Sequence, residues 1–268
     1  MGSGMNEFLE TAREAALEAG EVHAKYFDRD LQIDEKSGTH DLVTEADFES
    51  ERIIVETIRQ QFPDHNFLAE EERYETTDSE YTWIIDPLDG TNNFASGIPV
   101  FCASVALACK GELIAGAIYD LTRDELFYAS PGEGAYLNGQ RIRVNDAGIL
   151  SQAILATGFF YDRGPDMKNT LRNIEKFFLS DVRGIRRFGA AALDMAYVAS
   201  GRFTGFWEFS LHPWDFAAGK LIVEEAGGMV TGLHGEELPL ESHYVVASNG
   251  SIHQHILDVL NSAGSPEA

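Results

Sequence analysis

Basic side chains are scarce in this sequence of 268 residues. Only 20 Lys and Arg stand against 44 Asp and Glu, which gives a formal net charge of -24 at pH 7. Nucleic acid polymers and anionic membranes are bound through clustered Lys and Arg, so we expect neither as a partner. Adaptation to high salt is an alternative reason for the acidic excess. An anionic substrate would meet a repulsive field here unless bound cations reverse that field locally.

Long apolar runs and cysteines are also lacking. No apolar stretch approaches the ~20 residues that span a bilayer, and no basic segment followed by an apolar one marks a secretion signal near the N-terminus. We therefore expect a cytoplasmic protein. The only cysteines, Cys102 and Cys109, share one apolar run. An odd separation along a strand places them on opposite faces, so we expect two buried, reduced thiols.

The first half of the chain is predicted to hold two helices and then a set of strands. Apolar residues recur at helical spacing from Met5 to Phe27 and again over 45–61, where Thr44 is placed as an N-cap with Asp47 three positions later. Strand-like segments separated by glycine-containing turns follow at 66–69, 82–86, 100–109, 113–120 and 125–130. This pattern predicts a sheet built of hairpins.

After about residue 150, strands and helices alternate. Predicted strands at 153–158, 182–188, 203–208, 228–232 and 244–248 are interleaved with predicted helices at 167–179, 190–200, 214–226 and 252–261. Such alternation is typical of an α/β layered fold. We expect an α+β part over residues 5–150, which carries most of the acidic motifs, and an α/β part over residues 151–268 that completes the site.

The segment "WIIDPLDGTNNF" (83–94) places Asp86 and Asp89 at the end of an apolar run. Pro87 has no backbone N–H to donate, so we expect the strand to end at Asp86. An ordinary Asp-Gly turn is one interpretation, but a turn needs only one Asp, and two close carboxylates favour a cation between them. Mg²⁺ prefers carboxylate and carbonyl oxygens. The D-x-x-D-G-T spacing differs from the D-x-D-G-T of haloacid-dehalogenase-type phosphatases, which argues against an aspartyl-phosphate intermediate.

Three further acidic motifs have both a structural and a functional interpretation. The run Glu70 to Glu72 is either a solvated surface or, because it follows a strand next to that of Asp86, a source of metal ligands. "DLVTEAD" is either a capped helix start or part of a site. Asp215 in "HPWDFAAGKLIVEEAGG" lies in the first turn of a helix that Pro213 begins, where negative charge also suits the helix dipole.

Together, "WIIDPLDGTNNF", "HPWDFAAGKLIVEEAGG", "DLVTEAD" and the Glu after "FLA" resemble the inositol monophosphatase family of magnesium-dependent, lithium-sensitive phosphatases. The resemblance runs from about Phe8 to about Leu260. It implies a sugar-phosphatase-like alternating αβαβα sandwich, a homodimer, and two or three Mg²⁺ per site. The implied reaction is hydrolysis of a small phosphorylated substrate, foremost inositol monophosphate, by in-line attack of a metal-activated water. Fructose 1,6-bisphosphate, histidinol phosphate and adenosine 3',5'-bisphosphate are alternative substrates, and a non-catalytic binding protein is an alternative function.

The resemblance also implies roles for single residues. Glu70, Asp86 and the carbonyl of Leu88 resemble the ligands of a first magnesium, Asp86, Asp89 and Asp215 those of a second, and Glu70 with waters those of a third. The catalytic group would be Thr91, Asp47 and Glu70, with Thr91 and Asp47 polarising the attacking water.

The remaining implied contacts concern the substrate. The N–H groups of Gly90 and Thr91 would hold the phosphate, Lys36 and Asp41 match a mobile loop, and the alcohol part would meet Glu208, Gly189, Ala190 and Ala191. Ala69, Asn92 and Ala190 depart from the residues usual in the family, which bears on substrate choice. Arg186 and Arg187 are interpreted as surface ion-pair residues, with binding of a second anionic group as the alternative.

Overall fold

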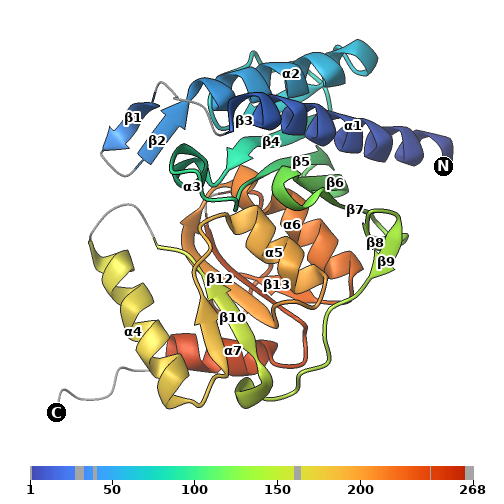
Figure 1. Cartoon of the computed structure of the whole chain (residues 1–268). Coiled ribbons are helices and arrows are strands. Elements are labelled where there is room, and N and C mark those ends of the chain that lie inside the picture. Colours follow the sequence, from blue (N-terminus) through green and yellow to red (C-terminus); the bar gives the residue numbers. More distant parts are fainter. Residues whose placement is uncertain (1, 28–32, 39–40, 160–163, 242, 263–268) are drawn as a thin grey trace.

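The computed structural model describes residues 2–27, 33–38, 41–159, 164–241 and 243–262. Two sheets alternate with three helical layers (Figure 1). Helices α1 and α2 cover the outer face of a seven-stranded sheet, α5 and α6 lie between the sheets, and α4 and α7 cover the outer face of a five-stranded sheet. The predicted αβαβα sandwich is confirmed. No helix in these ranges is both long and apolar enough to cross a membrane.

In the seven-stranded sheet, the strands lie side by side in the order in which they occur along the chain. Its order is β3-β4-β5-β6-β7-β8-β9, with β3 parallel to β4 and every later pair antiparallel. The antiparallel sheet of hairpins was therefore predicted correctly from β4 onward, but the parallel pair of β3 and β4 is not a hairpin, and β8 and β9 were missed. The strands are β3 (Asn66–Ala69), β4 (Tyr81–Asp89), β5 (Cys102–Cys109), β6 (Glu112–Asp120), β7 (Glu125–Ser130), β8 (Gly134–Leu137) and β9 (Gln140–Ile142).

Helices α1 (Gly2–Tyr26) and α2 (Glu45–Gln61) pack on this sheet through small and aliphatic residues. Ala12, Ala15, Ala16 and Ala19 are fully buried along one side of α1, as the helical spacing predicted. Helix α2 begins at the predicted capping box of Thr44 and Asp47. Before it, β1 (Ile33–Gly38) and β2 (Asp41–Thr44) form an antiparallel pair where the sequence suggested a loop.

The five-stranded sheet has the order β11-β10-β12-β14-β13. β10 runs parallel to β11 and β12, whereas β14 is antiparallel to β12 and β13. Its two parallel pairs require the helical crossovers that the alternating sequence predicted. The strands are β10 (Ile154–Thr157), β11 (Gly184–Arg186), β12 (Gly205–Leu211), β13 (Met229–Thr231) and β14 (His243–Ser248).

Between the sheets, α5 (Ala191–Ala199) and α6 (Pro213–Glu225) contribute to one large apolar cluster with strands of both sheets. Every residue of α5 is buried, as expected for a helix covered on all sides. On the outer face, α4 (Pro165–Leu179) and α7 (His253–Asn261) flank a separate cluster around Trp207 and Phe177. The two sheets use residues 66–142 and 154–248, and the domain division at residue 150 stays a prediction.

The two cysteines are free thiols, as predicted. Cys102 is buried in the apolar layer beside α5 and α6, whereas Cys109 is only half-buried, so the prediction of two buried thiols was wrong for Cys109. Cys109 is the last residue of β5, at the end of the strand away from the central layer.

Candidate active site

Asp86 and Asp89 share one side of β4 because the strand is bulged. In a regular strand, residues three apart point to opposite faces. Here Asp86 pairs with Ser104 and Asp89 with Cys102, so three steps on β4 oppose two on β5. The extra residue on β4 shifts the alternation of side chains, so that Asp86 and Asp89 point to the same face of the sheet. It also leaves Pro87 outside the hydrogen-bonded pairing of β4 with β5. The prediction that the strand ends at Asp86 was wrong, because a bulge accommodates proline as well as a turn does.

Hydrogen bonds fix this bulge on both sides. The carbonyl of Pro87 lies 2.9 Å from Nε2 of the fully buried His23, and the N–H of Leu88 donates to Oδ1 of Asp86 at 3.0 Å. A carbonyl can only accept, so Nε2 of His23 must carry the proton. Burial lowers the pKa of His23 to about 4 and keeps the ring neutral. A side chain of α1 thus supports the backbone between the two acids.

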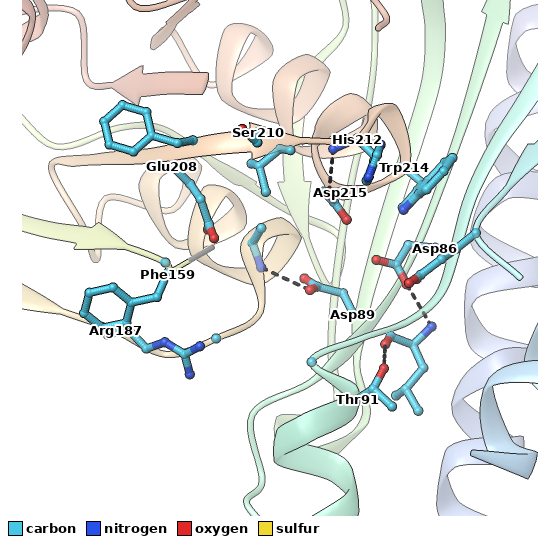
Figure 2. Close-up of a pocket in the computed structure, with 18 of the residues that line it drawn as sticks. Asp86, Asp89, Thr91, Phe159, Arg187, Glu208, Ser210, His212, Trp214 and Asp215 are labelled. Carbon is cyan, nitrogen blue, oxygen red and sulfur yellow. Dashed lines mark hydrogen bonds between the residues drawn. The ribbon is translucent and has the colours of Figure 1, made fainter. Parts of the chain in front are cut away.

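A cavity of about 340 Å³ lies where these acids point. Glu70 enters it from the segment after β3, Asp86 and Asp89 from β4, and Asp215 from the first turn of α6. Figure 2 shows the carboxylates of Asp86, Asp89 and Asp215 directed toward a common space. The structure therefore brings all four predicted acidic ligands to one cavity, together with Leu88, Gly90 and Thr91.

Backbone donors orient two of the carboxylates. Asp89 accepts hydrogen bonds from the N–H groups of Ala191 at 3.1 Å and Ala192 at 2.7 Å, at the start of α5. Asp215 accepts one from the N–H of His212 at 2.6 Å. Burial, together with the charge of Glu70, nevertheless raises the pKa of Asp89 to about 6 and that of Asp215 well above its usual range. The four acids therefore repel one another across the cavity.

Residues of this kind suit Mg²⁺, which takes carboxylate and carbonyl oxygens and relieves such repulsion. The carbonyl of Leu88, released from the ladder by the bulge, adds a neutral oxygen donor on the same loop. Among the described residues, no three Asp, Glu, His or Cys side chains are already gathered around one point as a complete ligand set. The oxygens surround the cavity, and their chemistry fits a hard dication.

Thr91 and Asp47 form a hydrogen-bonded pair at the edge of the cavity. The hydroxyl of Thr91 lies 2.9 Å from Oδ1 of Asp47 and 3.0 Å from the carbonyl of Leu88. Its single proton can serve only one of these acceptors at a time. The other oxygen of Asp47 accepts from the N–H and the hydroxyl of Thr44. Burial raises the pKa of Asp47 to about 6, and the charge of Glu70 contributes.

The opposite wall of the cavity comes from the five-stranded sheet. Glu208 lies within β12, not at its end as predicted, because a register shift between Glu208 and Leu211 bends the strand. Burial, the charge of Asp89 and, in opposition, that of Arg187 set the pKa of Glu208 at about 8. Figure 2 shows Glu208 extending from β12 toward the side of the cavity formed by Phe159 and Arg187.

Only some of the other predicted substrate residues line the cavity. Gly189 and Ala191 line the cavity, whereas Ala190 is buried behind them as the N-cap of α5. Lys36 lies in β1 and Asp41 in β2, so the predicted loop is a strand pair at those positions. The predictions for these two side chains lie outside the described part of the structure.

Several residues of the site carried no usable sequence signal. Glu51 of α2 is buried and accepts hydrogen bonds from the N–H groups of Glu71 and Glu72 and from the hydroxyl of Tyr74, which fixes the segment after Glu70. The apolar spacing of α2 hides its role. Arg187, predicted as a surface ion-pair residue, lines the cavity. So do Arg73, Phe159, Ser210, His212 and Trp214.

A layered αβαβα fold with an acid-lined cavity between its central elements defines a metal-dependent phosphatase architecture. The chain belongs to the inositol monophosphatase family, whose family model matches residues 5–265. The resemblance seen in the sequence motifs is thereby confirmed, and phosphatase chemistry that depends on metal is the general property of that family.

Relatives of two names match over nearly the whole chain. An inositol-1-monophosphatase from Synechocystis sp. is 42% identical over 99% of this chain and 92% of its own. The Nus factor SuhB of Escherichia coli is 42% identical over 91% of this chain and 92% of its own. The chain therefore resembles both a protein named as a phosphatase and a protein named as a Nus factor.

Solved structures show the same fold. The inositol monophosphatase from Anabaena (Nostoc) sp. superposes with a TM-score of 0.86 at 42% identity, covering 96% of each chain. An IMPase/NADP phosphatase complexed with Mg²⁺ and phosphate superposes with a TM-score of 0.86 at 26% identity, covering 98% of each chain.

Proposed function

We propose that the protein hydrolyses phosphate monoesters, with inositol monophosphate as its substrate and inositol and phosphate as products. One observation carries the proposal: Glu70, Asp86, Asp89 and Asp215, from three separate parts of the chain, line a single cavity with the Thr91–Asp47 pair at its edge. The name of the Synechocystis relative supports the choice of substrate.

Two or three Mg²⁺ ions are proposed for this cavity, in keeping with the Mg²⁺ and phosphate of the solved IMPase/NADP phosphatase. Glu70, Asp86, Asp89, Asp215 and the carbonyl of Leu88 would hold them. When bound, the ions would supply Lewis-acid activation of water and would neutralise the phosphate. No side chain of the site then needs to act as a nucleophile.

Thr91 and Asp47 are proposed to move the proton. With its own proton donated to Oδ1 of Asp47, the hydroxyl of Thr91 presents lone pairs to a water in the cavity. It can accept a hydrogen bond from that water and orient the water oxygen toward phosphorus. As the water gives its proton to the hydroxyl of Thr91, the hydroxyl gives its own proton to Oδ1 of Asp47, which becomes a neutral carboxylic acid. The hydrogen bonds from Thr44 hold Asp47 in the orientation required.

The substrate side of the site is proposed to include Gly90 and Thr91 at the phosphate, and Glu208, Gly189 and Ala191 at the alcohol. The carboxyl oxygens of Glu208, directed into the cavity, are suited to exchange hydrogen bonds with the hydroxyl groups of a polyol. Lys36 and Asp41 remain proposed members of a segment that completes the site. The homodimer and the cytoplasmic location also remain predictions from the sequence.

The test is phosphate release from a panel of monoesters, with Mg²⁺ titrated and with lithium added in a parallel series. Inositol 1-phosphate is expected to be the best substrate, ahead of fructose 1,6-bisphosphate, histidinol phosphate and adenosine 3',5'-bisphosphate. Asp86→Asn is expected to lower Mg²⁺-dependent turnover at least about 10³-fold, because each catalytic electrostatic contact is worth 10²–10³ in rate and Asp86 would contact two ions.

Asp258→Asn is the matched control, since Asp258 lies on the exposed side of α7 and hydrogen-bonds only Gln254 among the described contacts. Both variants should unfold at the wild-type temperature. Near-wild-type turnover by folded Asp86→Asn protein would refute the ligand role. A wild-type protein inactive on the whole panel would favour a non-catalytic binding function, in line with the Nus factor name of the E. coli relative.

A further inference from the structure

Gly158 faces the carboxyl group of Glu208 across the cavity wall. A methyl group built on Gly158 would overlap the carboxyl carbon and both carboxyl oxygens of Glu208, and these are the three atoms nearest to it. Gly158 is buried. The end of the Glu208 side chain thus occupies the space that any other residue at position 158 would fill.

The sheet register brings the two residues together. β10 and β12 are parallel, and Thr157 pairs with Trp207, so Gly158, the residue just after the end of β10, comes next to Glu208 of β12. Side chains at such positions point to the same face of a sheet. On that face the register shift after Glu208 turns β12 toward the cavity, and the missing side chain of Gly158 leaves room for the carboxylate.

Backbone conformation does not explain the glycine. Gly158 is absent from the positive-φ glycines among the described residues, so an L-residue could adopt its backbone angles. The space beside Gly158 is instead filled by one functional group, the end of the Glu208 side chain, which would have to move to admit a larger residue. On the far side, Arg187 and Phe159 are held together by a cation–π contact of 5.8 Å and close this part of the wall.

We propose that Gly158 is a specificity-determining positioning residue, which allows the carboxylate of Glu208 to lie where it selects the alcohol part of the substrate. The inference rests on the proposed function. A larger residue at 158 would push the carboxylate away from the wall, and the enzyme would lose its preference for polyol phosphates over esters without hydroxyl groups. The proposed metal ligands, on β4, on α6 and in the segment after β3, would keep their places.

The test compares kcat/KM for inositol 1-phosphate with kcat/KM for p-nitrophenyl phosphate, which has no polyol. Gly158→Ala is expected to reduce the ratio of the two about tenfold, as Glu208→Ala should. The double variant Gly158→Ala/Glu208→Ala is expected to match Glu208→Ala alone, because the added methyl group then meets nothing it must displace. Thermal unfolding should follow the same pattern: Gly158→Ala lowers Tm in the presence of Glu208 and not in its absence.

Gly148→Ala is the control, since a Cβ at Gly148 meets no atom within 4 Å. It should leave both kinetic constants and Tm unchanged. Equal losses for the two substrates in Gly158→Ala, or losses that multiply in the double variant, would overturn the proposal. Failure of the proposed function is separate and visible, because wild type and the Gly148→Ala control would then also release no phosphate.

Discussion

His23 is a polar residue with an unusual place in the molecule, since it is fully buried and its ring edges contact Phe94 and Phe101. The one hydrogen bond of its ring among the described contacts is to the carbonyl of Pro87, within the bulge that carries Asp86 and Asp89. The second ring nitrogen, Nδ1, has no partner there. The ring therefore tolerates no second proton, and its environment links the stability of the fold to pH.

The pH dependence has a definite sign. The folded-state pKa of His23 is about 4, against 6.5 for an ordinary histidine, so the unfolded chain binds a proton there before the folded one does. The contribution of His23 to the free energy of unfolding is fully present above pH 6.5 and is lost as the pH falls from 6.5 to 4. The shift corresponds to about 3 kcal/mol. His23→Gln keeps an N–H donor for Pro87 but does not titrate in this range.

Urea unfolding at pH 7 and pH 4 checks this expectation. From the higher to the lower pH, the wild-type free energy of unfolding should fall about 3 kcal/mol further than that of His23→Gln. Both proteins share every acidic residue, so the difference between them isolates the histidine. Parallel losses in the two proteins would show that His23 does not titrate on unfolding.

At the scale of single residues, the sequence identifies the acidic residues of the cavity better than it identifies the residues that support them. Asp86, Asp89, Glu70 and Asp215 were found because their motifs are local and chemically unusual. His23, Glu51 and Gly158 were missed because each acts through contacts with a distant segment, such as the hydrogen bonds that Glu51 accepts from the N–H groups of Glu71 and Glu72. Nothing in the adjoining sequence distinguishes such a residue from an ordinary helix or strand residue.

Helices α5 and α6 pack closely at a glycine. A Cβ on Gly219 would lie 2.8 Å from Cβ of Met195 and 3.0 Å from its sulfur. The Cβ of Met195 is attached to a helix buried on all sides and cannot move independently. The two helices form the layer between the sheets, and α6 also positions Asp215 at its first turn.

Gly219→Ala is expected to destabilise the protein by about 1 kcal/mol. Alanine favours a helix over glycine by about 1 kcal/mol, but overpacking of a core costs about 1–3 kcal/mol, and the second effect should prevail. Chemical unfolding measures the net change. Gly148→Ala serves again as the control with open space. An unchanged or raised stability would mean that α5 and α6 can separate at no cost.

At the scale of elements, periodicity located the helices to within a few residues, because amphipathic spacing extends over several turns. Strand ends were harder. β4 and β12 continue past their predicted ends through register shifts, and these depend on the partner strand instead of the local sequence. β8 and β9 have four and three residues, which is at most two periods of alternation, and they were missed.

For the molecule as a whole, the acidic excess predicts that salt stabilises the fold. Even if all 20 basic side chains were paired, 24 acidic ones would remain without a partner. Their repulsion is stronger in the compact state than in the unfolded chain. The Debye length falls from about 30 Å at 0.01 M salt to about 3 Å at 1 M, so added salt removes most of this repulsion.

Raising NaCl from 0.01 to 0.5 M should therefore raise Tm by at least about 2 °C, since 1 kcal/mol corresponds to about 2–4 °C in a large domain. Scanning calorimetry without divalent ions measures the effect and excludes binding in the cavity. If screening causes the rise in Tm, the rise should level off near 1 M NaCl. If exclusion of salt from the protein surface causes it, Tm should continue to rise at higher salt concentrations. A falling Tm would show that surface ion pairs outweigh the net repulsion.

The change from hairpin strands to alternating strands and helices predicted an α+β part and an α/β part, whereas the order of the layers came from the family resemblance. The position of the cavity was not predictable from that change in pattern, since it depends on how the end of β4 meets the start of α6 in the central layer. The family resemblance supplied that information from the sequence motifs. Physical reasoning from residues alone left the acidic motifs as separate candidates.

The bulge in β4 has a consequence for how this protein tolerates change. A central strand normally uses its carbonyl oxygens in pairing with its neighbours, but here the oxygen of Pro87 meets His23 and that of Leu88 meets Thr91. These main-chain oxygens thereby become available to nearby side chains, and that of Leu88 is the one proposed above as a metal ligand. Replacement of the Leu88 side chain leaves its carbonyl oxygen in place, so alanine scanning would overlook that oxygen, and only a change in backbone path could remove it.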